Sequence, residues 1–121
     1  MPYQIEWEPK GAVKLYRGDV TFQDIYQSEC DIQSAPEFDD LRYVVSVFEG
    51  NSGTALSKSE SDLILALRLG AMNTNPRIKY AYVSNDDYAR AQIGETIKKS
   101  NSVFPVQMFD NMTDAMVWAK S

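Results

Sequence analysis

The sequence contains no histidine, and this absence excludes a large class of catalytic sites. Imidazole is the usual general base of Ser-His and Cys-His nucleophilic sites and a common zinc ligand, and none of the 121 residues supplies it. Cys30 is the only cysteine, so no disulfide can form within the chain. We therefore predict that the protein is not an enzyme and that it carries no metal or other cofactor.

Long hydrophobic runs and excess positive charge are also missing. No apolar run approaches the ~20 residues that cross a bilayer, and the first residues, MPYQIEWEPK, lack the basic and apolar stretches of a secretory signal. We expect a cytoplasmic protein with no integral membrane segment. Lys and Arg number 12 against 17 Asp and Glu, which gives a net charge of −5. Because an acidic chain repels a phosphate backbone, we expect no nucleic-acid partner.

The N-terminal segment predicts a β-hairpin. Apolar and polar residues alternate over 3–7, which is the pattern of a half-buried strand. The sequence EPKG at 8–11 favours a type I turn. Residues 12–17 then predict the returning strand, with Val13 and Leu15 on its buried face.

The octapeptide LRYVVSVF at 41–48 predicts the central strand of a sheet, because it is apolar on both alternating faces and rich in β-branched residues. Strands and helices alternate along the chain in the order β-β-α-β-α-β-α-β-α. This order predicts one α/β domain spanning 1–121, with helices packed on a mixed, mainly parallel sheet. The other predicted elements are a helix from Thr21 to about Cys30, a helix at 59–72, a strand at 78–84, a helix at 88–99, an edge strand at 104–109 and a helix capped within 110–113.

Four segments, in this order, resemble the SpoIIAA-like group of STAS/SEC14-like domains: VKLYRGDVTFQDIYQS, LRYVVSVFEG, NPRIKYAYVSNDDYARAQIGE and VQMFDNMTDAMVWA. The resemblance covers nearly all of the chain. It implies a non-enzymatic regulatory or protein-interaction module that binds a protein partner or forms a homodimer. As an alternative, SEC14-like relatives imply a carrier or sensor of a small apolar or lipid-like ligand.

The loop after the predicted central strand, EGNSGT, is the first candidate site. It comprises Glu49, Gly50, Asn51, Ser52, Gly53 and Thr54. Ligands of parallel sheets gather beyond the carboxyl ends of the strands, near helix N-termini. Related anti-sigma-factor antagonists carry a phosphorylatable serine in the corresponding loop, so the resemblance implies phosphorylation of Ser52. An ordinary turn and a ligand-binding loop remain open, and a phosphate on Ser57 or Ser59 would also lie favourably at the helix N-terminus.

The helix that follows is apolar almost all the way round, with the sequence LILALRLGAM at 63–72. We expect one stripe to pack on the sheet, namely Leu63, Ala66, Leu67, Gly70 and Ala71. A second stripe, Leu65, Leu69 and Met72, then points elsewhere. A helix that is apolar on both sides needs cover on both sides, so this second stripe predicts a homodimer seam, an apolar ligand groove or contact with the loop at 31–40.

Acidic residues also follow several predicted strands, namely Glu49, Asp86, Asp87 and Asp110. Carboxylates at one sheet edge can bind Mg²⁺, but Asp is common at helix N-caps. We favour the capping interpretation. Tyr80 and Tyr82 lie on one face of their predicted strand, and we expect them to be core residues.

Overall fold

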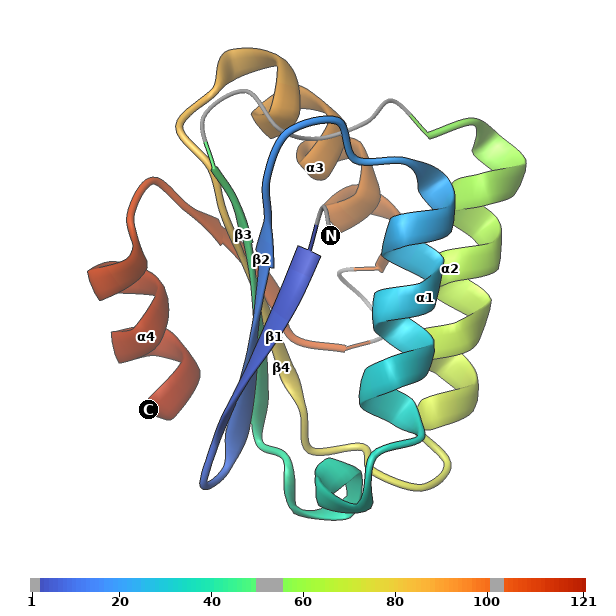
Figure 1. Ribbon diagram of the computed structural model, residues 1–121, viewed down its shortest axis with the longest axis vertical. Coiled ribbons are helices and arrows are strands. Elements are labelled where there is room, and N and C mark those ends of the chain that lie inside the picture. Colours follow the sequence, from blue (N-terminus) through green and yellow to red (C-terminus); the bar gives the residue numbers. More distant parts are fainter. Residues whose placement is uncertain (1–2, 50–55, 101–103) are drawn as a thin grey trace.

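A five-stranded mixed sheet organises the part of the chain that the computed structural model describes, residues 3–49, 56–100 and 104–121 (Figure 1). The strands lie side by side in chain order. β1 is antiparallel to β2, and all other neighbours are parallel. The predicted fold class is therefore confirmed. The strands are β1 (Tyr3–Glu8), β2 (Gly11–Tyr16), β3 (Tyr43–Phe48), β4 (Lys79–Val83) and β5 (Val106–Phe109).

The α-helices of the described residues cover the sheet unequally. Three lie on one face and α4 lies alone on the other, as Figure 1 shows. We call the two faces the three-helix face and the α4 face. The helices are α1 (Phe22–Gln33), α2 (Lys58–Ala71), α3 (Asp87–Ser100) and α4 (Met112–Lys120), and a short 3-10 helix, η1 (Pro36–Asp40), follows α1.

β3 is the middle strand, as its two-sided apolar sequence predicts. It pairs in parallel with β2 and with β4. Val44 belongs to the core under the three-helix face, whereas Val45 belongs to the core under α4. Because helices cover both faces of β3, its residues do not alternate between buried and exposed positions, which explains the continuous hydrophobic run.

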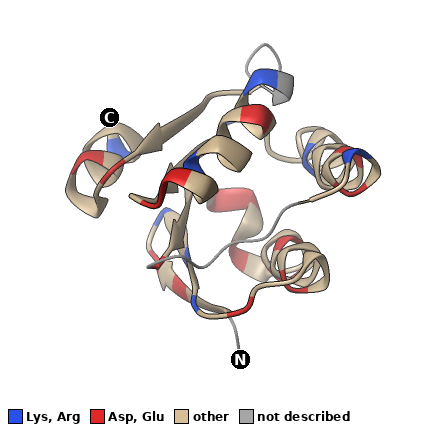
Figure 2. Cartoon of the chain, turned by 90° about the horizontal axis from the view of Figure 1, so that it is seen from above, with Lys and Arg blue, Asp and Glu red and all other residues tan. Residues whose placement is uncertain are grey.

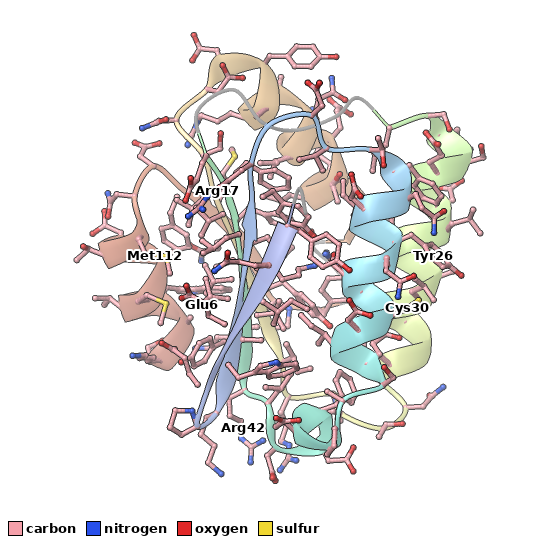
Figure 3. All side chains as sticks on the ribbon, in the orientation of Figure 1. Glu6, Arg17, Tyr26, Cys30, Arg42 and Met112 are labelled. Carbon is pink, nitrogen blue, oxygen red and sulfur yellow. The ribbon has the colours of Figure 1, made fainter. Side chains whose placement is uncertain are left out.

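The predicted hairpin is present, but its predicted buried face is incomplete. Val13 and Leu15 pack on the α4 face. Lys14 and Tyr16, on the opposite face of β2, are buried equally well, with 1% of each residue exposed. The physical reason is that β2 lies inside the sheet, between β1 and β3, so helices cover it from both sides. In Figure 3, Glu6 of the neighbouring β1 points to the α4 side.

Capping boxes begin the first two helices on the three-helix face. Thr21 caps α1 through Asp24, and Ser57 caps α2 through Glu60. α1 continues to Gln33, beyond the predicted end near Cys30, because Ile32 packs into the core. Tertiary packing thus extends the helix into a segment whose local sequence disfavours it.

The predicted orientation of α2 holds for Ala71, which is buried, but it is wrong for Leu63, Ala66 and Gly70. Its buried residues are Ile64, Arg68 and Ala71, whereas Leu63 is 51% exposed. Ala66 and Gly70 are exposed as well. The helix is turned so that a charged side chain, Arg68, faces the sheet, and the cause is the polar cluster described below.

Charged residues are distributed over strands and helices, with blue and red segments interspersed in the view of Figure 2. Across residues 3–49, 56–100 and 104–121, none of the helices combines the length and the apolar character needed to cross a bilayer.

Candidate ligand-binding site

A row of polar side chains crosses the middle of the three-helix face. Lys14 on β2 is the register partner of Ser46 on β3, and Ser46 is the partner of Tyr82 on β4. All three residues are buried. Three adjacent strands therefore place an ammonium and two hydroxyl groups at one level of a sheet face that is otherwise largely apolar.

Two charged residues from the helices complete this buried polar cluster. Glu29 of α1 accepts a hydrogen bond from Lys14 Nζ at 2.8 Å, at its Oε1 atom. Arg68 of α2 donates to the same oxygen from Nε at 3.1 Å and from Nη2 at 2.5 Å. The third guanidinium nitrogen, Nη1, donates to the Tyr82 hydroxyl. One carboxylate thus joins two helices and the sheet.

The electrostatics of the cluster keep its three ionisable groups charged. Burial alone would raise the pKa of Glu29, but the positive charges of Arg68 and Lys14 lower it to about 2. Burial alone would lower the pKa of Lys14, and the carboxylate of Glu29 reverses this and raises the pKa above its ordinary value. The pKa of Arg68 is likewise raised by Glu29 against the effect of burial. Near neutral pH the cluster is therefore an ion triad.

This triad carries an unbalanced charge. Of the charged side chains that the structure describes, Lys14, Glu29 and Arg68 are the buried ones. Two are cations and one is an anion, so a net charge of +1 lies inside the protein. Burying a charge without a counter-ion is unfavourable, and the excess positive charge is therefore a feature that requires an explanation.

A cavity of about 220 Å³ lies directly against the cluster. It is bounded by the three-helix face, by α2 and by α3. Lys14, Ser46, Arg68 and Tyr82 contribute to its wall, so the excess charge faces it. The other lining residues are Tyr16, Ile25, Phe48, Leu56, Lys58, Ser61, Ile64, Tyr88, Ala89, Gln92, Ile93, Glu95 and Thr96.

The cavity has a buried polar part and a mainly apolar part. The rings of Tyr16 and Phe48, at the carboxyl ends of their strands, are stacked with centroids 4.7 Å apart. Ile64 and Ile93 add buried aliphatic surface from α2 and α3. Tyr88 is exposed, which places it at the rim. The carboxyl ends of parallel strands are the usual place for ligands in α/β sheets.

The predicted site residues that the structure describes do not line this cavity. Gly50, Asn51, Ser52, Gly53 and Thr54 lie outside the described residues, so their predicted roles stay predictions. Glu49 is exposed and forms an ion pair with Arg17 at 2.8 Å. Ser57 caps α2 and Ser59 is exposed. None of the predicted site residues within the described ranges is among the cavity-lining residues.

The second stripe predicted on α2 is also divided. Leu65 and Met72 are half-buried and pack against the main core. Leu69 is exposed. The core cluster that Leu65 and Met72 contact includes Ile32 and Phe38. Contact with the segment at 31–40, one of the three predicted alternatives, therefore accounts for these two residues, and a homodimer seam or ligand groove stays a prediction.

Sequence reasoning missed the three charged residues of the cluster. Arg68 offered the clearest indication, since it interrupts the apolar run at 63–72. A charged residue is almost never fully buried unless it is paired. Lys14, between Val13 and Leu15 in a predicted strand, was a weaker indication of the same kind.

Of the strand-end carboxylates for which capping is predicted, Asp86 caps a helix, whereas Asp110 does not. Asp86 accepts a hydrogen bond from the Ala89 N–H at 2.9 Å, which is the predicted capping interaction. Asp110 pairs with Arg90, and α4 is capped by Asn111. Within the described part of the chain, no three His, Cys, Asp or Glu side chains are grouped as metal ligands.

No family model, curated protein or solved structure matches this chain. The resemblance to SpoIIAA-like domains therefore stays a prediction. What supports a function is the geometry of the cavity and of the charges beside it.

Proposed function

We propose that this protein binds a small molecule non-covalently in the cavity between the three-helix face of the sheet, α2 and α3, and that it acts as a carrier or sensor. The observation that carries the proposal is the composition of the cavity. Small-molecule sites are typically concave and mostly apolar, with a few well-placed polar groups. Here those polar groups come from Lys14, Ser46, Arg68 and Tyr82, which are held by separate elements.

The size of the cavity limits the ligand. A cavity of 150 Å³ is enough to hold benzene, so by proportion about 220 Å³ holds roughly nine non-hydrogen atoms. A compact aromatic molecule or a medium-length aliphatic chain fits this limit. This supports the carrier or sensor function that the sequence offers as an alternative.

The protonation states of the cluster favour binding over catalysis. The pKa of Lys14 is raised, so its ammonium keeps its proton and has no lone pair for nucleophilic attack. The pKa of Glu29 is lowered to about 2, which makes its carboxylate a poor general base near neutral pH. These groups are suited to holding a charge in a fixed position.

The predicted protein-interaction role has less support from the geometry. Leu63 and Leu69 are the large apolar residues that α2 exposes. They are six positions apart, and at about 100° per residue they point roughly 120° away from each other. They therefore do not form one continuous stripe, and homodimerisation stays a prediction.

A cavity-filling substitution tests the proposed function. Ala89 lines the cavity from α3 and is buried, whereas Ala91 lies on the same helix and is exposed. We compare Ala89→Phe with the matched control Ala91→Phe in NMR titrations with benzamide and octanamide. The wild type and the control Ala91→Phe are expected to bind the amides saturably, with chemical-shift changes centred on cavity residues such as Gln92 and Ile93. Ala89→Phe is expected to lose binding.

Two results would refute the proposed function. One is the absence of saturable shifts in the wild type with both amides and with their acid counterparts, benzoate and octanoate. The other is equal binding by folded Ala89→Phe and Ala91→Phe. If Ala89→Phe does not fold, the positions of the shifted resonances in the wild type decide whether the ligand binds in the cavity. Binding elsewhere would shift the resonances of residues away from the cavity.

A further inference from the structure

We propose that the ligand is a small amphipathic monocarboxylate, with its anionic group beside Lys14, Ser46 and Tyr82 and its apolar body against Phe48 and Ile64. This inference rests on the proposed function, because it names the ligand class of the same cavity. It adds a sign and a magnitude of charge, which the shape of the cavity alone does not provide.

The charge balance of the buried cluster is the first argument. The hydrogen bonds recorded from Lys14 and Arg68 to Glu29 all end on one oxygen atom, Oε1. One negative charge thus serves two cations, and a net charge of +1 remains in a site where each charged residue is at most 3% exposed. A bound monoanion would bring the sum to zero, which is the state that burial favours.

The available hydrogen-bond donors are the second argument. A lysine ammonium has three N–H donors, and within the described residues one of them is directed to Glu29. Lys14 also lines the cavity, together with the hydroxyl-bearing residues Ser46 and Tyr82. An ammonium and two hydroxyl groups on one wall can donate to the two oxygens of a carboxylate, and such charge-assisted bonds are the stronger kind.

The charges farther from the cluster favour a single negative charge on the ligand. The other charged lining residues are Lys58 and Glu95, which are exposed and opposite in sign. The whole chain has a net charge of −5, of which the buried cluster contributes +1, so −6 remains on the rest. That field opposes a polyanion, and a net charge of +1 leaves a dianion such as a phosphate monoester only half balanced.

The apolar part of the wall selects the body of the ligand. Phe48 and Ile64 lie among the cavity-lining residues, and Ile64 is also part of a buried core cluster. A free inorganic anion would leave this surface without contact. An acid of about nine non-hydrogen atoms fills the cavity and covers both of its parts.

Matched acids and amides test the inference. Benzoate and benzamide have the same shape and differ in charge, as do octanoate and octanamide. By calorimetric titration of the wild type, we expect each acid to bind about tenfold tighter than its amide or better, the range of a charge-assisted hydrogen bond. Lys14→Met, which keeps side-chain length but makes the triad neutral, is expected to bring this ratio close to one while amide affinity is kept.

A second lysine substitution controls for the change of net charge. Lys79 is half-buried on β4, its ammonium binds carbonyl oxygens near the end of α4, and it does not line the cavity. Lys79→Met is expected to keep the preference for acids. If Lys14→Met does not fold, the ratio of acid to amide affinity is compared between the wild type and Tyr82→Phe, which removes one hydroxyl donor. We expect the ratio to be smaller in Tyr82→Phe.

The outcomes separate this inference from the proposed function. Amides that bind as tightly as acids, with Ala89→Phe abolishing both, would overturn the anionic ligand and leave the cavity function intact. A Lys14→Met variant that weakens acid and amide equally would show a structural role for the lysine and also overturn the inference. If neither acids nor amides bind, both proposals fail.

Discussion

Removing the one anion of the buried triad and removing one of its two cations should have opposite consequences for stability. Glu29→Gln leaves Lys14 and Arg68 side by side in the interior with no counter-ion. Lys14→Met leaves one carboxylate paired with one guanidinium, because Arg68 still donates to Glu29 from two nitrogens. Both substitutions alter the Lys14–Glu29 contact, but they leave opposite charge balances, a net +2 for Glu29→Gln and zero for Lys14→Met.

The magnitude follows from the pKa of Glu29. Lowering it from 4.5 to about 2 corresponds to about 3 kcal/mol of preferential stabilisation of the charged carboxylate by its surroundings. This value is similar to the cost of about 3–5 kcal/mol that removing one member of a buried ion pair typically has. For Lys14→Met we expect a change within about 1 kcal/mol or a gain, since the large cost of breaking a buried ion pair comes from the uncompensated charge left behind, and here the remaining Glu29–Arg68 pair is balanced.

Equilibrium unfolding in urea at pH 7, followed by circular dichroism, measures both effects. We expect the transition of Glu29→Gln at a much lower urea concentration than that of the wild type, with a similar slope. Lys14→Met should unfold at or above the wild-type midpoint. Equal destabilisation by the two substitutions, or a loss below about 1 kcal/mol for Glu29→Gln, would show that the triad is not governed by its charge balance.

Three further predictions concern pH, close packing and a buried amide. Because the folded-state pKa of Glu29 lies below its unfolded value of 4.5, its contribution to stability is complete above pH 4.5 and is lost between about pH 4.5 and pH 2. When the free energy of unfolding is measured as a function of pH, the wild type should lose about 3 kcal/mol over this range. Glu29→Gln should not show this loss. A Cβ at Gly11 would lie 2.1 Å from the buried Tyr43 ring, whereas one at Gly70 meets nothing within 4 Å. Thermal melts should show Gly11→Ala destabilised by about 1–3 kcal/mol and Gly70→Ala more stable by about 1 kcal/mol, and a wild-type-like Gly11→Ala would contradict the close contact. Asn75 is buried and donates to the carbonyls of Phe38 and Leu41 at 2.8 and 2.9 Å, so Asn75→Ala should cost about 2 kcal/mol or more in urea unfolding; no loss would mean that water replaces the amide.

The order of elements and the central strand were predictable because their determinants are local. The alternation at 3–7, the apolar run at 41–48 and the capping residues Thr21 and Ser57 each act within one element or one turn. Such patterns depend on neighbours along the chain, which a sequence shows directly. In the structure these residues form β1 and β3 and cap α1 and α2.

The cavity and the charged cluster were not predictable in the same way. Glu29 is 15 residues from Lys14 and 39 residues from Arg68 along the chain. Each of the three side chains has an ordinary interpretation as a solvent-exposed residue when it is considered alone. Only the packing of α1 and α2 on the same face of the sheet brings them together, and that packing also sets the rotation of α2, which hydrophobic periodicity placed incorrectly.

The position of Lys14 connects stability with the proposed ligand. The middle of β2 is covered from both sides, and an apolar residue there would satisfy the strand pattern without a desolvation cost. Natural sequences break such local rules mainly at functional sites. If Lys14→Met unfolds at a higher urea concentration than the wild type and also loses the preference for acids, then Lys14 lowers the stability of the free protein and binds the carboxylate of the ligand in the complex. A purely structural lysine would behave differently, since its removal would weaken the fold and leave the ratio of acid to amide affinity unchanged.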